Sequence, residues 1–350
     1  MSFRFAVIGG GWYGCHIAAS FRSLGFEVTV FEREERLFSR ASGNNQFRLH
    51  QGFHYARSYR TRVQSRDGYM RFIERYPTLS EKVETNLYAV PNQDSLIDFL
   101  TYRLIMTSSG IEFREVEPAK YNLSNCSGVL LTDERVLLTS KARDVFSRRL
   151  EGALRLGEEV TSIVEHSDSI AVNGEIFDYV VDATWGGFSS IDIPVFYEPT
   201  LLLYYKSPNL GSYALTMVDG PLCSIYPTDE VDVFTLSSVT HTPLANFATM
   251  QESRAFLNQL SHDTIHQKRR LMEAEISKYY PGFVDDFEYI EPQLSIKTKI
   301  IGATDDRSCY VSKFGRRFVV MSGKIDTIFY ASETILSMIE AENEIQVARL

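Results

Sequence analysis

Short apolar runs and helical periodicity alternate at the start of this chain and define the first elements that we predict. Residues 5–8 form a continuous apolar run, as in a buried parallel strand, and residues 15–24 repeat apolar positions at helical spacing. A glycine follows that helix, and residues 27–31 return to a strand pattern that ends at Glu32. Strand, helix and strand in this order predict one complete βαβ unit.

Three glycines join the first strand to the helix in the spacing G-x-G-x-x-G: Gly9, Gly11 and Gly14. We expect Gly9 to permit a tight turn, Gly11 to let the backbone approach a pyrophosphate, and Gly14 to let the helix pack on the strand. The helix N-terminus then directs N–H groups and a positive dipole end at the phosphates. Glu32 is placed to bind a ribose diol and, as an acid, disfavours NADP. The motif alone does not separate FAD from NAD.

The same criteria predict the later elements. We expect helices over residues 57–76, 95–108, 141–155, 246–260, 263–280 and 328–340. We expect strands over residues 86–90, 129–132, 136–138, 158–163, 169–172, 179–183, 201–206, 213–218, 222–226 and 231–239. The pair 158–163 and 169–172, next to Asn173-Gly174, reads as a hairpin, and the strand 179–183 ends in glycines.

Residues 196–294 show strands and then helices, without another glycine fingerprint. This order indicates a substrate domain inserted into a nucleotide domain. We therefore predict an α/β chain with a discontinuous Rossmann-like nucleotide domain and an inserted α+β domain built on a mostly antiparallel sheet. The nucleotide domain would comprise residues 1–85, 140–195 and 295–350, and the substrate domain residues 86–139 and 196–294.

Composition narrows the class of protein. The chain has 350 residues, 44% hydrophobic, and a formal net charge of −9, which argues against a nucleic-acid partner. Its four cysteines have neither C-x-x-C nor metal-ligand spacing, so we expect neither a disulfide framework nor a metal site. The first strand begins within a few residues of the N-terminus, and no apolar run approaches the ~20 residues of a membrane span. We therefore expect a cytoplasmic protein.

Residues 41–55 form an unusual segment, rich in small and amide residues, which suits a loop that wraps a polar ligand. A serine, an asparagine and a His-x-Gly-x-x-Tyr pattern follow one another there, at Ser42, Asn44, His50, Gly52 and Tyr55. With the N-terminal fingerprint, this segment resembles the FAD-dependent oxidoreductases of the D-amino-acid-oxidase superfamily, which contains glycine oxidase, sarcosine oxidase and L-2-hydroxyglutarate oxidase.

The resemblance implies FAD as the cofactor of the nucleotide domain. It implies that Ser42 and its neighbours contact the pyrophosphate, that Val160 meets the adenine, and that residues 183–186 lie over the pyrophosphate. The family closes with a glycine pair and a helix facing the flavin, and Lys324 stands where histidine is common. The predicted cofactor-binding set is Gly9, Gly11, Trp12, Tyr13, Gly14, Glu32, Arg33, Ser42, Asn44, Val160, Ala183, Thr184, Gly186, Gly323 and Lys324.

Lys297 lies in the segment where a substrate-binding arginine often sits in the family, which weakens the case for a simple amino-acid carboxylate clamp. As holders of an anionic group we consider Arg48, Arg57 and Lys297, with arginine better suited to bidentate contact. His50 is the candidate base for a 2-hydroxy acid, and a structural histidine in the loop is an equal alternative.

Four tyrosines are candidates to line a substrate pocket, although tyrosines in a sheet are more often packing residues: Tyr204, Tyr205, Tyr213 and Tyr226. The predicted catalytic set is His50, Arg48, Tyr205 and Tyr226. A further hypothesis makes Cys309 a covalent flavin anchor.

We therefore expect an enzyme that oxidises a C–N or C–O bond of a small polar substrate, an amine, amino acid or 2-hydroxy acid, by hydride transfer to flavin N5. The electron acceptor is oxygen or another molecule that the sequence does not identify. Two alternatives stay open: an NAD-dependent dehydrogenase, and a flavin-binding protein without turnover.

Overall fold

The computed structural model describes residues 3–189, 192–302 and 307–348. The chain divides into two compact units, each assembled from separate segments. The first unit comprises Met1–Gly43, Ser140–Pro194 and Arg307–Leu350, and the second comprises Asn44–Thr139 and Val195–Asp306. The division falls near residues 140 and 195, and the domain bounds given from the sequence stay predictions. Residues 44–85 and 295–302, which we assigned to the nucleotide domain, group with the second unit in this division.

The first unit is built on a six-stranded sheet in which every strand is parallel to its neighbours except β19, which runs antiparallel to β20. The strand order is β19 (Tyr310–Phe314), β20 (Arg317–Met321), β13 (Tyr179–Asp182), β1 (Arg4–Ile8), β2 (Glu27–Glu32) and β9 (Leu154–Leu156). This is the Rossmann-like arrangement predicted from the βαβ pattern. Because the chain leaves β1 toward β2, while β13 lies on the other side of β1, the sheet has a switch point between β1 and β13.

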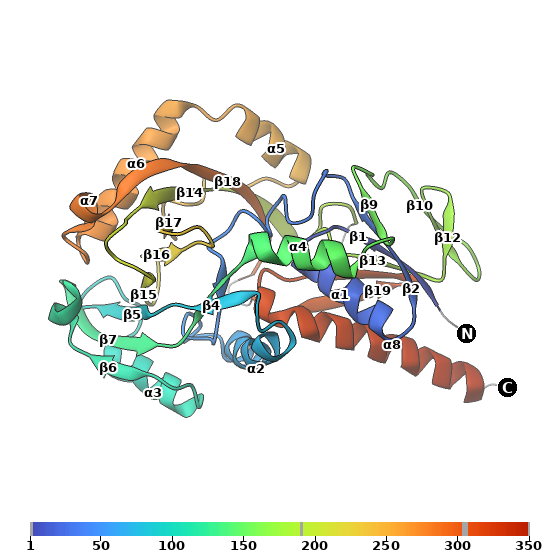
Figure 1. Ribbon diagram of the computed structural model, residues 1–350, viewed down its shortest axis with the longest axis horizontal. Coiled ribbons are helices and arrows are strands. Elements are labelled where there is room, and N and C mark those ends of the chain that lie inside the picture. The colour runs from blue at the N-terminus through green and yellow to red at the C-terminus, as the bar shows by residue number, and fades with distance from the viewer. Residues whose placement is uncertain (1–2, 190–191, 303–306, 349–350) are drawn as a thin grey trace. The chain divides into compact units, whose positions relative to one another are not determined.

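Helices and a small sheet complete this unit. Helix α1 (Trp12–Ser23) connects β1 to β2 and lies beside α8 (Ile328–Ala348), where His16 Nε2 and Ser332 Oγ are 3.2 Å apart (Figure 1). The remaining elements are α4 (Thr139–Arg149), η2 (Ile325–Thr327) and the antiparallel strands β10 (Ile163–Glu165), β11 (Ile170–Val172) and β12 (Glu175–Phe177). The turn Asn173-Gly174 joins β11 to β12, a strand that the sequence did not predict. The strand expected over residues 158–163 begins only at Ile163, where β10 pairs with β11.

Several helix boundaries differ from the prediction; for example, α5 (Met250–Asn258) begins four residues later than expected, and α8 continues to Ala348. Helix α4 ends at Arg149 and not at residue 155, because Gly152 takes φ +77° and turns the chain into β9, which pairs with β2. Helix α3 (Phe99–Ser108) begins four residues later than expected. Its N-cap is Asp98, whose carboxylate accepts from Thr101 N at 2.9 Å, while Ser95 Oγ donates to the carbonyl of Ile97.

The second unit is built on an eight-stranded sheet that is antiparallel except where β15 and β5 run parallel. Its order is β18 (Glu288–Ile300), β14 (Val195–Lys206), β17 (Val233–Ser238), β16 (Cys223–Pro227), β15 (Tyr213–Met217), β5 (Thr85–Pro91), β7 (Cys126–Thr132) and β6 (Arg114–Val116). A three-stranded sheet joins β3 (Arg48–Leu49), β8 (Arg135–Leu137) and β4 (Ser80–Lys82). The helices are α2 (Tyr59–Arg75), α3, η1 (Pro118–Tyr121), α5 (Met250–Asn258), α6 (His262–Ser277) and α7 (Phe283–Asp286).

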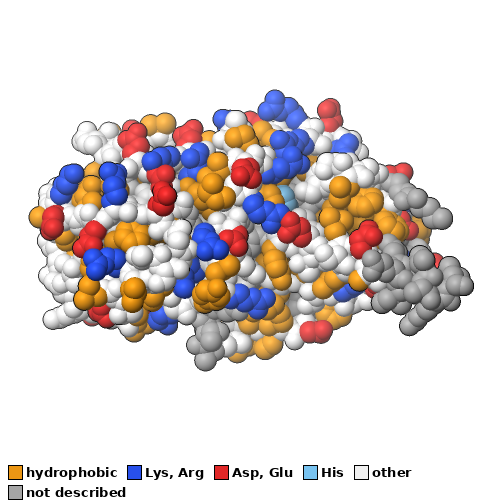
Figure 2. Space-filling model, turned by 90° about the horizontal axis from the view of Figure 1, so that it is seen from below, with side chains coloured by type: hydrophobic (Ala, Val, Ile, Leu, Met, Phe, Trp, Pro, Cys, Tyr) orange, Lys and Arg blue, Asp and Glu red, His pale blue; other side chains and the backbone are white. Residues whose placement is uncertain are grey.

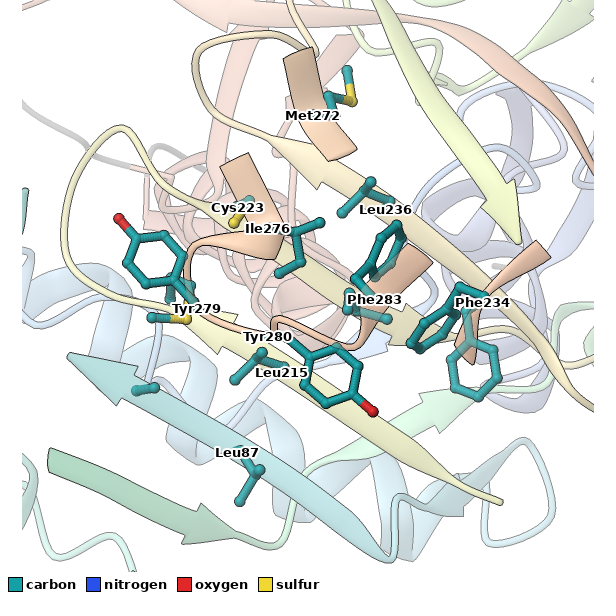
Figure 3. Close-up of a cluster of buried hydrophobic side chains, with 14 of the residues drawn as sticks. Leu87, Leu215, Cys223, Phe234, Leu236, Met272, Ile276, Tyr279, Tyr280 and Phe283 are labelled. Carbon is teal, nitrogen blue, oxygen red and sulfur yellow. The ribbon is translucent and has the colours of Figure 1, made fainter. Parts of the chain in front are cut away.

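The two faces of the eight-stranded sheet differ in chemistry because side chains alternate along each strand. On one face Leu215 and Leu236 pack against Ile276 and Phe283 of helices α6 and α7 (Figure 3). The residues that alternate with Leu215 and Leu236 along their strands, such as Thr216 and Thr235, point to the opposite face, where buried hydroxyl and amide groups lie together. We call this opposite face the polar face.

Charged groups of both signs are interspersed on the molecular face in Figure 2. Helices in the described ranges all fall short of the length and apolarity that a bilayer crossing requires.

Candidate functional site

The glycines after β1 have distinct steric reasons to be glycine. Gly9 has φ +104°, a left-handed conformation that other residues rarely adopt. A Cβ atom on Gly14 would lie 1.8 Å from the carbonyl oxygen of Gly9, so close packing of α1 on the end of β1 excludes any side chain there. A Cβ atom on Gly11 would lie 2.5 Å from Ser42 Oγ. Gly9 therefore allows the turn and Gly14 allows the close packing of α1, as the sequence predicts. Gly11 lies against Ser42, a neighbour that the sequence did not indicate.

The N-terminus of α1 remains suited to an anion. It has no side-chain cap at Gly11 and no acidic residue in its first turn, and Trp12 N donates to the neutral hydroxyl of Ser42 at 3.1 Å. The Trp12 ring itself is buried against Phe38, with ring centroids 4.9 Å apart, so it anchors the loop in the core. The geometry therefore offers backbone N–H groups and a dipole to phosphates.

Glu32 holds the glycine loop in place. Its carboxylate accepts from Gly10 N at 2.6 Å and from Glu34 N at 2.9 Å. Arg33 beside it pairs with Glu34 at 3.2 Å and with Glu159 at 3.9 Å. Contacts of Glu32 and Arg33 with a ribose or FAD stay predictions.

The end of β13 lies beside the glycine loop, as the switch point requires. Ala183 N donates to the carbonyl of Ile8 at 2.9 Å, and a Cβ atom on Gly9 would lie 3.0 Å from Ala183 O. Thr184 N and Oγ1 both donate to Asp182, and Gly186 has φ +74°. Ala183, the first residue of the predicted segment 183–186, therefore lies against Gly9 of the glycine loop.

The segment after β20 is held to the same region by Tyr13. The Tyr13 hydroxyl donates to the carbonyl of Lys324 at 2.5 Å, and its pKa is raised, chiefly by burial and further by Cys309 and Asp326. A Cβ atom on Gly323 would lie 3.3 Å from the Trp185 ring. Residues 323–324 are therefore linked both to the start of α1 and to the segment after β13.

The other predicted cofactor residues have the following places. Val160 is buried in a cluster with Phe31 and Val180. Asn44 is the first residue of the second unit. Cys309 is buried in the first unit and contributes to the raised pKa of Tyr13, and its role as a flavin anchor stays a prediction.

In the second unit, the segment 45–51 is hydrogen-bonded to the polar face at several points. Gln293 Nε2 donates to the carbonyl of Asn45 at 3.1 Å, and Gln46 Nε2 donates to Ser224 Oγ at 3.2 Å. Further buried polar side chains on this face are Asn86, Tyr88, Thr132, Thr216, Tyr226 and Thr235. Buried polar groups need partners, and a sheet face rich in them suits a polar ligand.

Arg48 and His50, both predicted catalytic residues, are buried at this face. Arg48 Nη1 donates to Thr216 Oγ1 at 2.7 Å, and its guanidinium lies 4.3 Å from the centre of the Tyr226 ring. His50 Nδ1 lies 3.8 Å from an oxygen of Glu134.

Glu134 is the site residue that sequence reasoning missed. Its side chain is fully buried, and its oxygens accept from Gln51 N at 2.7 Å and from the Tyr88 hydroxyl at 2.6 Å. Burial raises the pKa of its carboxyl, and the hydrogen bonds from Tyr88 and Gln51 and the charge of Arg48 oppose that rise. In the sequence Glu134 lies in an ordinary charged turn, Asp133-Glu134-Arg135, which carries no signal of burial.

The predicted catalytic tyrosines are in different places. Tyr226 lies beside Arg48, but its hydroxyl donates to the carbonyl of Arg135 at 3.1 Å, and burial raises its pKa. Tyr205 points to the apolar face, where its ring packs on Phe283 and its hydroxyl donates to Glu273 at 2.9 Å. The structure therefore does not bring Tyr205 together with Arg48, and a catalytic role for it has no support from this geometry.

The two other candidate anion-binding residues, Arg57 and Lys297, also lie in the second unit. Arg57 pairs with Asp219 on the surface of the second unit. Lys297 lies half-buried in β18.

Comparison with known proteins gives consistent matches. The family model described as FAD dependent oxidoreductase matches residues 4–317. The chain is 57% identical over 337 residues to FAD-dependent monooxygenase FPY4 of Fusarium mangiferae, covering 96% of this chain and 91% of that protein. It is 26% identical over 368 residues to FAD-dependent monooxygenase kojA of Aspergillus flavus, covering 96% and 85%.

Solved structures show the same fold. Glycine oxidase from Geobacillus kaustophilus superposes with a TM-score of 0.73 at 14% identity, covering 97% of this chain and 95% of that one. L-alpha-glycerophosphate oxidase from Mycoplasma pneumoniae gives 0.72 at 12% identity, covering 95% and 93%.

Proposed function

This chain belongs to the FAD dependent oxidoreductase family, and from that premise we propose that it is a monooxygenase of a small polar organic molecule. One atom of O₂ enters the substrate, and the other leaves as water with two electrons from a reduced nicotinamide nucleotide. FAD is its cofactor. The glycine loop, the anion-compatible start of α1 and the adjoining residues 183–186 and 323–324 fit a dinucleotide. When bound, FAD supplies the redox chemistry, and the protein supplies binding, orientation and charge.

The observation that carries the proposed substrate type is the polar face of the second unit. Buried groups there include a cation, an imidazole and a carboxylic group: Arg48, His50 and Glu134. A site for an apolar substrate would not bury such groups, because each costs free energy unless it is paired. The name of the relative that is 57% identical supports oxygen as the co-substrate.

We assign His50 the role of proton acceptor from the substrate. Its Nδ1 lies 3.8 Å from Glu134, so a proton taken up by the imidazole would create a charge next to a buried carboxylic group. Gln51 N and the Tyr88 hydroxyl hold Glu134 in its orientation. Glu134 is therefore proposed as the residue that positions His50.

A second candidate is oxidation of a C–N or C–O bond without oxygen insertion. The same His50 and Glu134 pair favours it, because removal of a hydroxyl proton is the step that such an oxidation needs. The two functions differ in the fate of oxygen atoms, and they can be separated by isotope labelling.

The experiment uses the purified protein with its flavin, a panel of small oxygen-rich acids, hydroxy acids and amines, and NADH or NADPH as the electron donor, with parallel reactions that lack the donor. Turnover under ¹⁸O₂ that places label in the organic product supports monooxygenation. Turnover that leaves the product unlabelled supports the second candidate. A protein that purifies without flavin and does not bind added FAD would contradict both.

A further inference from the structure

Arg48 is buried with two of its nitrogen atoms left without an acceptor. The side chain is only 6% exposed, and Nη1 donates to Thr216. In the described part of the chain, Nε and Nη2 have no hydrogen-bond partner. A buried donor without an acceptor is costly, and more so for a charged group, so these atoms point to a ligand.

The two free atoms form one edge of the guanidinium plane. Nε–H and Nη2–H point in nearly the same direction and match two coplanar oxygens. Arg135, on the neighbouring strand β8, shows this edge in use: its Nε donates to Ser80 Oγ at 2.9 Å and its Nη2 to the carbonyl of Ser80 at 2.8 Å. The same edge of Arg48 meets no such pair of acceptors.

The guanidinium of Arg48 lowers the pKa of Glu134 through its charge, but Glu134 does not hydrogen-bond to it. Among the described residues Arg48 forms no ion pair, and the nearby Glu134 directs its oxygens to Gln51 N and Tyr88. The Tyr226 ring, 4.3 Å away, and Thr216 fix the guanidinium in place. A fixed, desolvated cation binds an anion much more strongly than a neutral ligand.

We propose that the Nε–Nη2 edge of Arg48 binds a planar organic anion of the substrate that presents two adjacent oxygens, a carboxylate or an ionised enolone. This inference rests on the proposed function and narrows its substrate from small polar molecules to acids. Amines and neutral alcohols without such a group would bind weakly.

The test is calorimetric titration of the flavin-loaded protein with benzoate, with tropolone as the enolone anion and with benzamide as the neutral control. We expect at least one of the two anions to bind and benzamide to bind weakly. Arg48→Met should weaken the binding of that anion roughly 10- to 100-fold, the loss expected for a charged hydrogen-bonded contact. Arg48→Lys keeps the charge but loses the two-donor edge, and should also weaken binding.

Arg135→Met is the matched control, because it removes an arginine whose edge is already satisfied by Ser80, and it should leave anion binding unchanged. Equal affinity in wild type and Arg48→Met, or no anion binding by the wild type, would overturn the proposal. Loss of FAD from both Arg48 variants would assign the edge to the flavin and also overturn it. Because anion binding is measured without turnover, the proposed oxidation can fail while this inference holds.

Discussion

Replacement of Gly11 by alanine separates two reasons for a glycine at that position: the closeness of Ser42 Oγ and the predicted approach of the FAD pyrophosphate. The new Cβ would lie 2.5 Å from Ser42 Oγ, and real Cβ contacts stay at or above 3.0 Å, so the hydroxyl must move by 3.0 − 2.5 = 0.5 Å. That shift weakens the 3.1 Å hydrogen bond from Trp12 N to Ser42 Oγ at the start of α1. Loss of a bond of this kind costs about 1 kcal/mol.

A double-mutant cycle in flavin-free protein tests the steric argument. We expect Gly11→Ala to lower the free energy of unfolding in urea by about 1 kcal/mol in the wild-type background, and by less than about 0.5 kcal/mol when Ser42→Ala has removed the clash. An equal loss in both backgrounds would refute the role of Ser42.

FAD affinity in the same variants tests the predicted approach of the pyrophosphate. If the backbone at Gly11 lies against the cofactor, the added methyl group should weaken FAD binding roughly 10- to 100-fold in both backgrounds, the effect of an overpacked contact. Wild-type FAD affinity in the double variant would refute a pyrophosphate contact at Gly11, and it would leave the packing against Ser42 as the reason for the glycine.

Three further predictions concern single substitutions. Gly14→Ala should prevent close packing of α1 and abolish FAD binding, because its Cβ would lie 1.8 Å from the Gly9 carbonyl; flavin retained after gel filtration would contradict this. Glu134→Gln should become more stable relative to wild type as pH rises above about 4.5. The pKa of Glu134 is raised in the native state, so the native carboxyl binds more protons than the unfolded one and the stability of the wild type falls as pH rises. Urea midpoints of the two proteins that differ equally at low and at neutral pH would count against this prediction. Ile276→Ala should cost about 2–5 kcal/mol in urea unfolding, since this buried side chain packs on the apolar face; a loss below about 1 kcal/mol would show that the site repacks.

Sequence patterns predict the first unit well because its decisive contacts are local. The glycine spacing and the strand on either side of α1 lie within about thirty residues, and they position Gly9 and Gly14 as expected. The match of residues 4–317 to the FAD dependent oxidoreductase family confirms the family that the motifs resemble. Strand β9 was missed because Leu154 continues the helical spacing of α4, and only its pairing with β2 makes it a strand.

The second unit depends on contacts between distant segments, which no local pattern reports. Strand β18 was missed because its polar residues and Pro292 resemble a loop, and a proline is tolerated in an edge strand. Glu134 was missed because nothing in its neighbours shows that Tyr88 and the backbone of Gln51 enclose it. Arg48 and His50 were chosen from the sequence, and the structure places both at the polar face.

The order of strands in the two sheets has a consequence for biosynthesis. The parallel sheet of the first unit takes in β20 (Arg317–Met321), and the large sheet of the second unit is completed by β18 (Glu288–Ile300). Until these late segments leave the ribosome, β13 and β14 present open edges that other chains can pair with. Neither sheet can therefore be completed before its late strand has been synthesised, and pairing between segments far apart in the sequence slows folding in general. A chain cut short before residue 288 completes neither sheet and is a candidate for aggregation.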